Sequence, residues 1–351
     1  MSRTPRILIA GTHSGVGKTT LTLALMAAFR EKKLKVQGFK AGPDYIDPSH
    51  HTAVTGRPSR NLDTWMMGGD ACAETLHHAS SDADVSVIEG VMGLYDGRLG
   101  DRASGSTSEL AKLLRVPLIL LVNAKGMGQS AAALVKGYKE FDRDTPLAGV
   151  ILNNVSNERH FSFLKDPIER NCDLPVLGYV SRNTSITLPE RHLGLVPHGE
   201  GTISAEFYSG LTGALEHVDV DRVIKIANSA PDLPLPTERI FSPPDTRVPV
   251  RIAVARDAAF SFYYEDNLAL LRLFGAEIIP FSPLVDPELP PDVDAIYIGG
   301  GFPELYAGQL ESNTSMRDKM RQAADRGVVI YGECGGMMYL LERLIDFEGS
   351  L

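Results

Sequence analysis

The sequence predicts an α/β protein in which a parallel sheet carries helices on both faces, followed by a second, smaller α/β unit. Three observations lead to this prediction. Continuous apolar runs alternate with helix-favouring stretches over residues 7–180, and the first run enters a glycine-rich turn and then a helix. A proline-rich stretch separates this region from another alternating series. Continuous apolar strands between helices are typical of sheets that are buried on both faces.

Composition limits the protein class. With 351 residues, of which 43% are hydrophobic, the chain is long enough for two domains. Its net charge of −9 argues against a nucleic-acid partner. No leading apolar segment or membrane-spanning run is present, so we expect a cytoplasmic protein without a membrane partner. The wide spacing of Cys72, Cys172 and Cys334 disfavours a zinc site and a disulfide framework.

The first apolar run, residues 7–10, is followed by GTHSGVGKTT at residues 11–20. Backbone N–H groups freed by Gly15 and Gly17 can surround a phosphate, while Lys18 reaches the outer phosphates and the Thr19 hydroxyl can ligate Mg²⁺. The pattern indicates a P-loop for a nucleoside triphosphate, in a longer variant than usual because Thr12 stands where the common pattern has glycine. We therefore assign nucleotide binding to Thr12, His13, Ser14, Gly15, Val16, Gly17, Lys18, Thr19 and Thr20.

Further strands and helices follow in alternation. We expect strands at residues 35–39, 85–89, 117–122, 149–154 and 175–180, and helices at residues 106–115, 128–140 and 158–170. In parallel sheets of this kind, ligands bind at the carboxyl ends of the strands. The residues directly after each strand are therefore the candidate site residues.

Acidic residues follow two of these strands. Asp44 and Asp47 lie in KAGPDYIDP, residues 40–48, which we expect to be a loop stiffened by its prolines. Glu89 ends another strand and Asp96 follows it. Carboxylates beside a P-loop are suited to Mg²⁺, and we assign the metal to Thr19, Asp44 and Glu89. Ordinary turn chemistry also favours Asp beside Pro and Gly, and the sequence leaves that alternative open.

Two amides and a histidine complete the candidates in the first unit. Asn153 and Asn154 end a strand, where their side chains can bind an adenine edge or simply cap the strand. His192 lies in LPERHLGLVPHGE, residues 188–200, a mixture of proline, histidine and charge that suits an ordered loop of an active site. We expect His192 to be structural or to face the substrate.

We expect a first domain over residues 1–218, a linker over 219–248 and a second domain over 249–351. In the second domain, strands at 251–255 and 277–280 and helices near 267–274 and 312–326 precede VVIYGECGGMMYL, residues 328–340. Cys334 there follows a strand and precedes a helix, with glycines beside it, as expected of a nucleophile on a sharp turn. The N–H groups of Gly335 and of the Gly300 and Gly301 region suit an oxyanion hole.

A general base for Cys334 is missing. Such a site needs a histidine within reach, yet all nine histidines lie at or before His217. We therefore expect the second domain to be cut short at its carboxyl end.

Together these motifs resemble the cobyrinic acid a,c-diamide synthases of corrinoid biosynthesis. The first domain is similar to dethiobiotin synthetases, which share the longer P-loop spacing, and the second to class I glutamine amidotransferases of the triad type. The resemblance covers essentially the whole chain and rests on GTHSGVGKTT, KAGPDYIDP, VIEGVMGLYDG, LPERHLGLVP, IGGGFPE and YGECGGMMYL.

The resemblance implies ATP- and Mg²⁺-dependent amidation of two carboxylates, a and c, of a corrin-ring precursor through acyl phosphates, with glutamine or ammonia as the nitrogen source. It implies catalytic roles for Lys18, Asp47, Asp96 and Cys334, and contacts with the tetrapyrrole for Lys40, Asp44, Tyr45, Ile46 and His192. A homodimer is a possible assembly. The family's glutaminase histidine is expected beyond Leu351, so we expect a chain of this length to use free ammonia without hydrolysing glutamine.

Two alternatives stay open at this point. A close relative with the same motifs would diamidate nickel-sirohydrochlorin or another tetrapyrrole. A partitioning-type ATPase switch would bind partners without amidation, but such proteins carry a second lysine five positions before the P-loop lysine, where this chain has His13.

Overall fold

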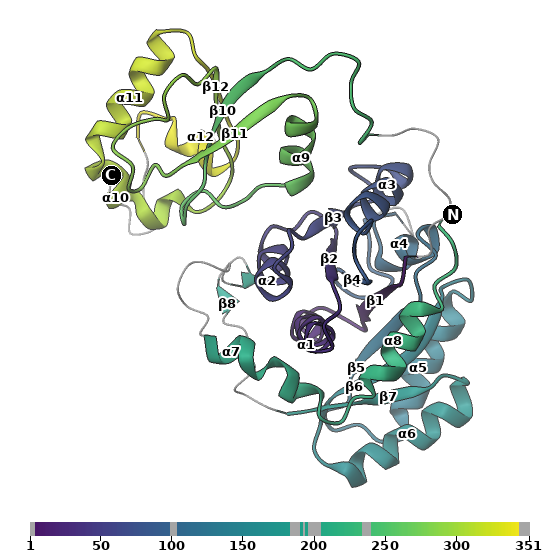
Figure 1. Cartoon of the computed structure of the whole chain (residues 1–351). Coiled ribbons are helices and arrows are strands. Elements are labelled where there is room, and N and C mark those ends of the chain that lie inside the picture. The colour runs from purple at the N-terminus through teal and green to yellow at the C-terminus, as the bar shows by residue number, and fades with distance from the viewer. Residues whose placement is uncertain are drawn as a thin grey trace. The chain divides into compact units, whose positions relative to one another are not determined.

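In a computed structural model, the chain forms two compact units, Met1–Ile240 and Phe241–Leu351. The structure describes residues 4–98, 104–182, 190–191, 194–195, 205–233 and 240–343. Each unit has its own parallel sheet, as the sequence predicts (Figure 1). No helix within these ranges is long and apolar enough to cross a membrane.

The first unit is built on a seven-stranded sheet with the strand order β3-β2-β4-β1-β5-β6-β7. All neighbouring strands are parallel. The strands are β1 (Arg6–Gly11), β2 (Val36–Ala41), β3 (Arg60–Leu62), β4 (Val85–Glu89), β5 (Leu118–Asn123), β6 (Leu147–Val155) and β7 (Val176–Ser181). A separate antiparallel pair joins β8 (Glu190–Arg191) and β9 (Gly194–Leu195).

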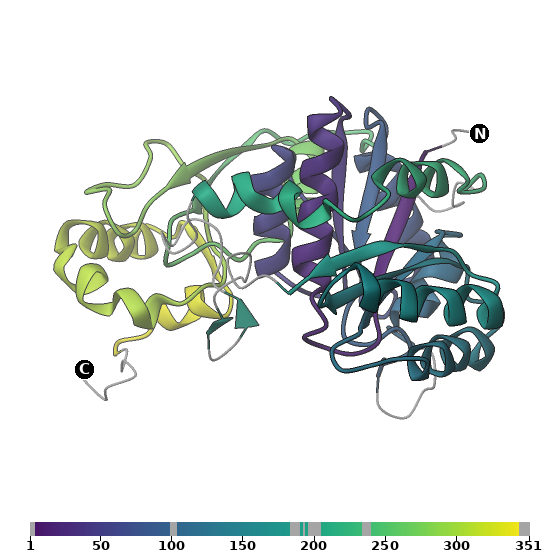
Figure 2. The same ribbon diagram turned by 90° about the horizontal axis from the view of Figure 1, so that it is seen from below.

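Helices cover both faces of this sheet because side chains of its central strands alternate between two buried clusters. Leu8 and Ala10 of β1 enter one cluster, and Ile7 and Ile9 enter the other. The first face carries α3 (Gly69–Ala79), α4 (Thr107–Leu113), α5 (Ser130–Phe141) and α6 (Glu158–Cys172). The second carries α1 (Lys18–Glu31), α2 (Ile46–Thr55), α7 (Ala205–Gly210), η2 (Leu211–Leu215) and α8 (Val220–Asn228). Helices α1 and α2 lie side by side (Figures 1 and 2).

The stretch predicted as a loop over residues 40–48 ends earlier than expected, because α2 begins at Ile46. The Asp44 Oδ1 atom accepts hydrogen bonds from the backbone N–H groups of Ile46 and Asp47, at 2.7 and 3.2 Å. Pro48 is tolerated because the N–H groups of a first helical turn have no partner within the helix. Asp47 is therefore fixed on a helix and does not lie in a loop.

The start of the predicted linker also differs. Val220–Asn228 forms α8, and its side chains Val223 and Ala227 are completely buried in the first unit. The Asp219 side chain accepts a hydrogen bond from the Arg222 N–H at 2.9 Å and so caps the helix. The division between the units lies at Ile240, beyond this helix.

The second unit has a four-stranded parallel sheet with the order β11-β10-β12-β13. Its strands are β10 (Val250–Ala255), β11 (Ala276–Phe281), β12 (Ala295–Ile298) and β13 (Val329–Gly332). Its helices are α9 (Glu265–Leu273), η3 (Pro303–Tyr306), α10 (Ala307–Ser312), α11 (Thr314–Asp325) and α12 (Gly335–Tyr339). The turn between β13 and α12 contains Cys334, as the sequence predicts.

Candidate functional site

The glycine-rich loop joins β1 to α1 at the carboxyl edge of the central sheet. Gly15 and Gly17 have φ angles of 76° and 99°, in the left-handed region that favours glycine. A Cβ atom at Gly17 would lie 2.6 Å from the Asn153 Nδ2 atom, so the loop also packs tightly against β6. All the residues predicted to bind nucleotide, from Thr12 to Thr20, lie in this loop or in the first turn of α1.

Lys18 folds back over the loop. Its ammonium group donates hydrogen bonds to the carbonyl oxygens of Met92, at 2.5 Å, and of His13, at 3.3 Å. Burial and the nearby charge of Lys40 lower the pKa of Lys18, although the carboxylates of Glu89, Asp47 and Asp96 act in the opposite direction. The lysine is thus held close to the acidic residues that the sequence predicts at this edge.

Glu89 is the centre of a buried polar cluster and has no exposed surface. Its Oε1 atom accepts hydrogen bonds from the Thr19 hydroxyl at 2.6 Å and from the Lys40 ammonium at 2.9 Å. Its Oε2 atom lies 2.7 Å from the His51 Nε2 atom. A carboxylate removed from water needs such partners because its desolvation is costly.

Lys40 links Glu89 to the acids of the next segment. Its ammonium lies 2.5 Å from the Asp47 Oδ2 atom, 3.3 Å from the Gly90 carbonyl oxygen and 3.9 Å from the Asp44 Oδ2 atom. With Glu89, these contacts occupy all three donors of the ammonium group. The structure therefore places Lys40 inside the cluster, between the nucleotide loop and α2.

The charges in this cluster depend on one another. Burial opposes the charge of Lys40, but the carboxylates of Glu89, Asp47 and Asp44 outweigh it and raise the lysine pKa. Burial likewise opposes the charge of Glu89, while Lys40, His51 and Thr19 together lower its pKa well below the usual range. Burial and the charge of Glu89 raise the pKa of Asp47 well above its usual range. Lys40 and Glu89 thus form the ionised pair around which Asp47 is arranged.

Thr19 and Glu89 fit a magnesium site. A hydroxyl and a carboxylate oxygen meet directly beside the phosphate-binding loop, and Mg²⁺ in such sites takes few protein ligands together with water and phosphate oxygens. Asp44 fits less well, because its Oδ1 atom accepts the two N–H groups at the start of α2. Within the described residues, no group of three or more His, Cys, Asp or Glu side chains forms a metal-binding set.

The remaining acid, Asp96, lies in the loop after β4. Its Oδ2 atom accepts a hydrogen bond from the Gly93 N–H at 3.0 Å, and its side chain is exposed. Tyr45 and Ile46, at the start of α2, are half-buried. His192 lies outside the described residues.

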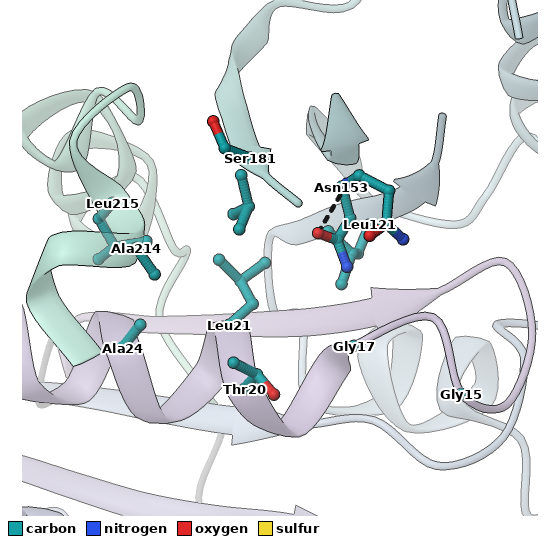
Figure 3. Close-up of a pocket in the computed structure, with 12 residues that line it drawn as sticks. Gly15, Gly17, Thr20, Leu21, Ala24, Leu121, Asn153, Ser181, Ala214 and Leu215 are labelled. Atoms are coloured by element: carbon teal, nitrogen blue, oxygen red, sulfur yellow. Dashed lines mark hydrogen bonds between the residues drawn. The ribbon is translucent and has the colours of Figure 1, made fainter. Parts of the chain in front are cut away.

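A pocket of about 200 Å³ opens beside the glycine-rich loop (Figure 3). It is lined by the loop, α1, β5, the ends of β6 and β7, and η2. The lining residues are Gly15, Gly17, Thr20, Leu21, Ala24, Leu121, Asn153, Asn154, Val180, Ser181, Ala214 and Leu215. The Asn153 amide donates to the Val16 carbonyl oxygen at 2.8 Å, and the Asn154 amide donates to the Asn123 side chain at 3.0 Å. Both predicted amides therefore line the pocket, and each also holds neighbouring backbone or side chain in place.

The second unit presents its cysteine on a strained turn. Cys334 has a φ of 51° and is exposed, whereas Cys72 and Cys172 are buried. A Cβ atom on Gly300 would lie 3.5 Å from the Cys334 sulfur, and one on Gly335 would lie 3.1 Å from the Gly301 nitrogen. Of the three glycines predicted to stabilise an oxyanion, Gly300 therefore lies beside the thiol, Gly335 follows it in the chain, and Gly301 packs against Gly335.

Sequence reasoning missed His51 and Ser59. His51 is completely buried, and its Nδ1 atom lies 3.1 Å from the Ser59 hydroxyl, so the two residues fix the far side of Glu89. The available signal was the spacing of Asp47 and His51, which are four residues apart and so share one face of a helix. The expectation of a loop at residues 40–48 concealed it.

Comparison with known protein families finds a matching domain family for each of the two units. Residues 7–196 match the CobQ/CobB/MinD/ParA nucleotide binding domain, and residues 251–350 match the CobB/CobQ-like glutamine amidotransferase domain. The first unit is therefore a nucleotide-binding P-loop domain. Among solved structures, the signal recognition particle receptor FtsY from Elizabethkingia anophelis aligns with 52% of this chain and 58% of its own, at 17% identity and a TM-score of 0.38.

Similar curated proteins extend over nearly the whole chain. A cobyrinate a,c-diamide synthase from Dehalococcoides mccartyi is 47% identical, over 99% of this chain and 75% of its own. The enzyme of that name from Listeria monocytogenes serotype 4b is 51% identical over 95% of this chain and 74% of its own. The cobyrinate a,c-diamide synthase from Methanosarcina acetivorans is 47% identical over 97% of this chain and 71% of its own.

Proposed function

The chain belongs to the cobyrinate a,c-diamide synthase family, and from this we propose that it uses ATP to convert the a and c carboxylates of cobyrinate or hydrogenobyrinate into amides. Glutamine supplies the nitrogen, in cobalamin biosynthesis. Its enzyme class is that of a glutamine amidotransferase-type ligase. The observation that carries the proposal is the direct contact between the nucleotide loop and the buried acid cluster, from Thr19 through Glu89 and Lys40 to Asp47.

The chemistry explains why a nucleotide loop is needed. A carboxylate is a poor electrophile, so one of its oxygens first attacks the terminal phosphorus of ATP and ADP leaves. Ammonia then adds to the acyl carbon, and inorganic phosphate departs with the former carboxylate oxygen. One ATP is used for each amide. Catalysis here consists mainly of positioning and of stabilising charge.

The residues of the glycine-rich loop would bind the phosphates of ATP in this reaction. Lys18 and the backbone N–H groups around Gly15 and Gly17 would hold the phosphates, with Lys18 giving up its contacts to the Met92 and His13 carbonyls. Thr19 and Glu89 would hold Mg²⁺. When bound, this ion neutralises charge on the phosphate oxygens.

The segment from Lys40 to Asp47 would position the substrate carboxylate. Because Lys40 is saturated by Glu89, Asp47 and Gly90, we propose that it positions Asp47 and does not itself reach the tetrapyrrole. Asp44 and Asp47, at the start of α2, would align the carboxylate with the phosphate. Tyr45 and Ile46 remain the candidates for ring contact, and Asp96 is the candidate acid on the opposite loop.

The pocket beside the loop suits the nucleotide base. Its lining includes Gly15 and Gly17 of the loop and also Asn153 and Asn154, so a base seated there is next to phosphates held by the loop (Figure 3). The Asn153 amide oxygen already accepts from the Asn154 backbone N–H at 2.8 Å. The Asn154 amide oxygen and the Ser181 hydroxyl are among the other polar groups of the lining that suit a base edge.

We propose that Cys334 releases the ammonia, because residues 251–350 match a glutamine amidotransferase domain. This proposal replaces the expectation, drawn from the missing histidine, that the chain uses only free ammonia. Its sulfur would add to the side-chain amide carbon of glutamine while Gly300, Gly301 and Gly335 stabilise the oxyanion. The proton given up by the thiol passes to the amide nitrogen, which leaves as ammonia while a thioester forms. Water then hydrolyses the thioester to glutamate and free thiol. The strained φ of Cys334 supports this role, because such turns present a nucleophile clear of its neighbours.

The proposal is tested by mass spectrometry of the products from ATP, Mg²⁺ and ammonium with cobyrinate, hydrogenobyrinate or nickel-sirohydrochlorin. We expect two successive exchanges of acid for amide on a corrinoid and slower amidation of nickel-sirohydrochlorin. ATP hydrolysis that continues at the same rate with or without any tetrapyrrole, and yields no amide, would contradict it.

A further inference from the structure

Exposed apolar side chains lie beside the acid cluster at the same edge of the sheet. Trp65, the single tryptophan of the chain, is 58% exposed, and Met66 next to it is 56% exposed. The Arg98 guanidinium carbon lies 5.0 Å from the centroid of the indole ring. Isolated exposed apolar residues are common, but here a large aromatic ring, a thioether and a cation occur together.

The strand order places this group next to the proposed reaction centre. Trp65 follows β3 and Arg98 follows β4, and these two strands flank β2. Leu62 at the end of β3 is paired with Ala41 at the end of β2. The contact between Trp65 and Arg98 therefore brings two loops together beside the segment that carries Asp44 and Asp47.

Hydrogen bonds fix the backbone of the loop that carries Trp65. The Asp63 carboxylate accepts from the N–H groups of Trp65 and Met66, at 2.9 and 3.0 Å. The Thr64 hydroxyl donates to Glu109 at 2.6 Å, which fastens this loop to α4. The Asn61 amide donates to the carbonyl oxygens of Gly42 and Asp44, at 2.9 and 2.7 Å. The ring is thus exposed on a fixed loop that is tied directly to the acidic segment.

We propose that Trp65 and Arg98 form a platform for the tetrapyrrole substrate. The indole packs against a face of the macrocycle, and Arg98 pairs with a peripheral carboxylate other than the one being activated. This proposal rests on the proposed function and names residues that determine its substrate specificity. A tetrapyrrole joins a wide apolar ring to an acidic rim, and an aromatic face with an adjacent guanidinium matches both features.

The single tryptophan allows a direct binding test. Excitation selective for tryptophan reports on Trp65 alone. Titrating the whole chain with cobyrinate, without ATP, should quench this emission in a saturable way, because the ring stacks on the indole. The Phe163→Ala variant, which removes a 62% exposed aromatic ring on α6, should show the same quenching curve.

Steady-state kinetics distinguish the loss of a substrate contact from a folding defect. Trp65→Ala should raise KM for the tetrapyrrole roughly tenfold, which corresponds to about 1.4 kcal/mol of binding free energy. KM for ATP should stay within about twofold, less than about 0.4 kcal/mol. Trp65→Phe should restore most of the affinity. Arg98→Met should also raise KM for the tetrapyrrole, whereas Arg170→Met, which removes an exposed arginine on α6, should not.

Amide formation by the unmodified chain is measured first. If it forms no amide, the proposed function fails and this inference falls with it. If amides form while Trp65 emission is unquenched and Trp65→Ala keeps the original KM, the platform is overturned and the function stands. A changed sedimentation coefficient of Trp65→Ala with an unchanged KM would show that a second copy covers the indole, which also overturns the platform.

Discussion

At the scale of single residues, the account depends on how Glu89 is held. Its Oε1 atom accepts from Thr19 and Lys40, and its Oε2 atom contacts His51, so both carboxylate oxygens have partners in a site without water access. Removing one partner from such a buried pair leaves the other charge uncompensated. The stability of the first unit and the geometry of its site therefore depend on the same contacts.

Substitution of Glu89 by Gln should lower the free energy of unfolding by about 3 kcal/mol, because Lys40 then lacks its fully buried counter-ion. Lys40→Met should lower the free energy of unfolding by a similar amount. The double variant should cost less than the sum of the two, because no uncompensated charge of this pair remains. Chemical denaturation of the three variants measures these values, and strictly additive costs would contradict the pairing.

The three cysteines should react at very different rates. Cys334 is exposed, while Cys72 and Cys172 are 0% and 2% exposed. A glutamine analogue that carries an electrophilic carbon should alkylate Cys334 at least about tenfold faster than either buried thiol. Peptide mapping of the native protein measures this, with iodoacetamide as the control reagent. Equal labelling of the three cysteines would show that the turn at Cys334 is not formed.

At the scale of elements, both candidate sites occur where a parallel strand ends and a helix begins. Such turns bring backbone groups very close together. In the second unit, a Cβ atom on Gly336 would lie only 2.1 Å from the Ile298 carbonyl oxygen, whereas a Cβ atom on Gly308 in α10 meets nothing within 4 Å. The elbow therefore depends on glycine for space.

These two glycines should respond to alanine in opposite ways. Gly336→Ala should destabilise the second unit by more than about 3 kcal/mol, because backbone must move away from the new methyl group. Gly308→Ala should stabilise it by about 0.5 kcal/mol, since alanine favours a helix. Thermal unfolding of the two variants measures the difference. A Gly336→Ala variant with unchanged thermal stability would contradict the close packing of α12 against β12.

Much of this arrangement follows from local patterns. The strands β1, β5 and β7 are recognisable as nearly continuous apolar runs, and β2, β4 and β6 as runs that are apolar at most positions. The three-residue β3 is too short to be recognised in this way. The P-loop and the turn at Cys334 are recognisable because their glycines occur at fixed positions beside a chemically reactive residue.

Other features arise from tertiary contacts. Helix α2 is concealed by Pro48 and by acidic residues that also favour turns, and its start is stabilised by Asp44. The saturation of Lys40 and the contact of His51 with Glu89 depend on β2, α2 and β4 meeting. Local sequence patterns do not specify how these three elements pack together.

At the scale of the whole molecule, each of the four buried hydrophobic clusters among the described residues draws its members from one unit. The first unit extends to α8 and beyond. Arg6, completely buried, donates to the Leu114 carbonyl oxygen at 3.1 Å and to the Pro231 carbonyl oxygen at 2.6 Å. Burial lowers the pKa of Arg6 to about 10. This residue ties β1 to the segment after α8.

Two fragments test this boundary. The fragment of residues 1–240 should fold and bind ATP with an affinity within about threefold of the whole chain, a difference below about 0.7 kcal/mol. The fragment of residues 1–218 should be less stable by at least about 2 kcal/mol, because it loses the buried side chains of α8 and the Pro231 partner of Arg6. Denaturation and nucleotide titration measure both. Equal stability would place α8 outside the first unit.

The central claim is that the nucleotide bound at the P-loop activates a carboxylate of the tetrapyrrole. It is tested most directly with cobyrinate whose carboxylates carry a heavy oxygen isotope, incubated with ATP, Mg²⁺ and ammonium. We predict that one heavy oxygen appears in inorganic phosphate for each amide formed, because phosphate departs with the former carboxylate oxygen. Amide formation with unlabelled phosphate, or label in AMP, would contradict the account.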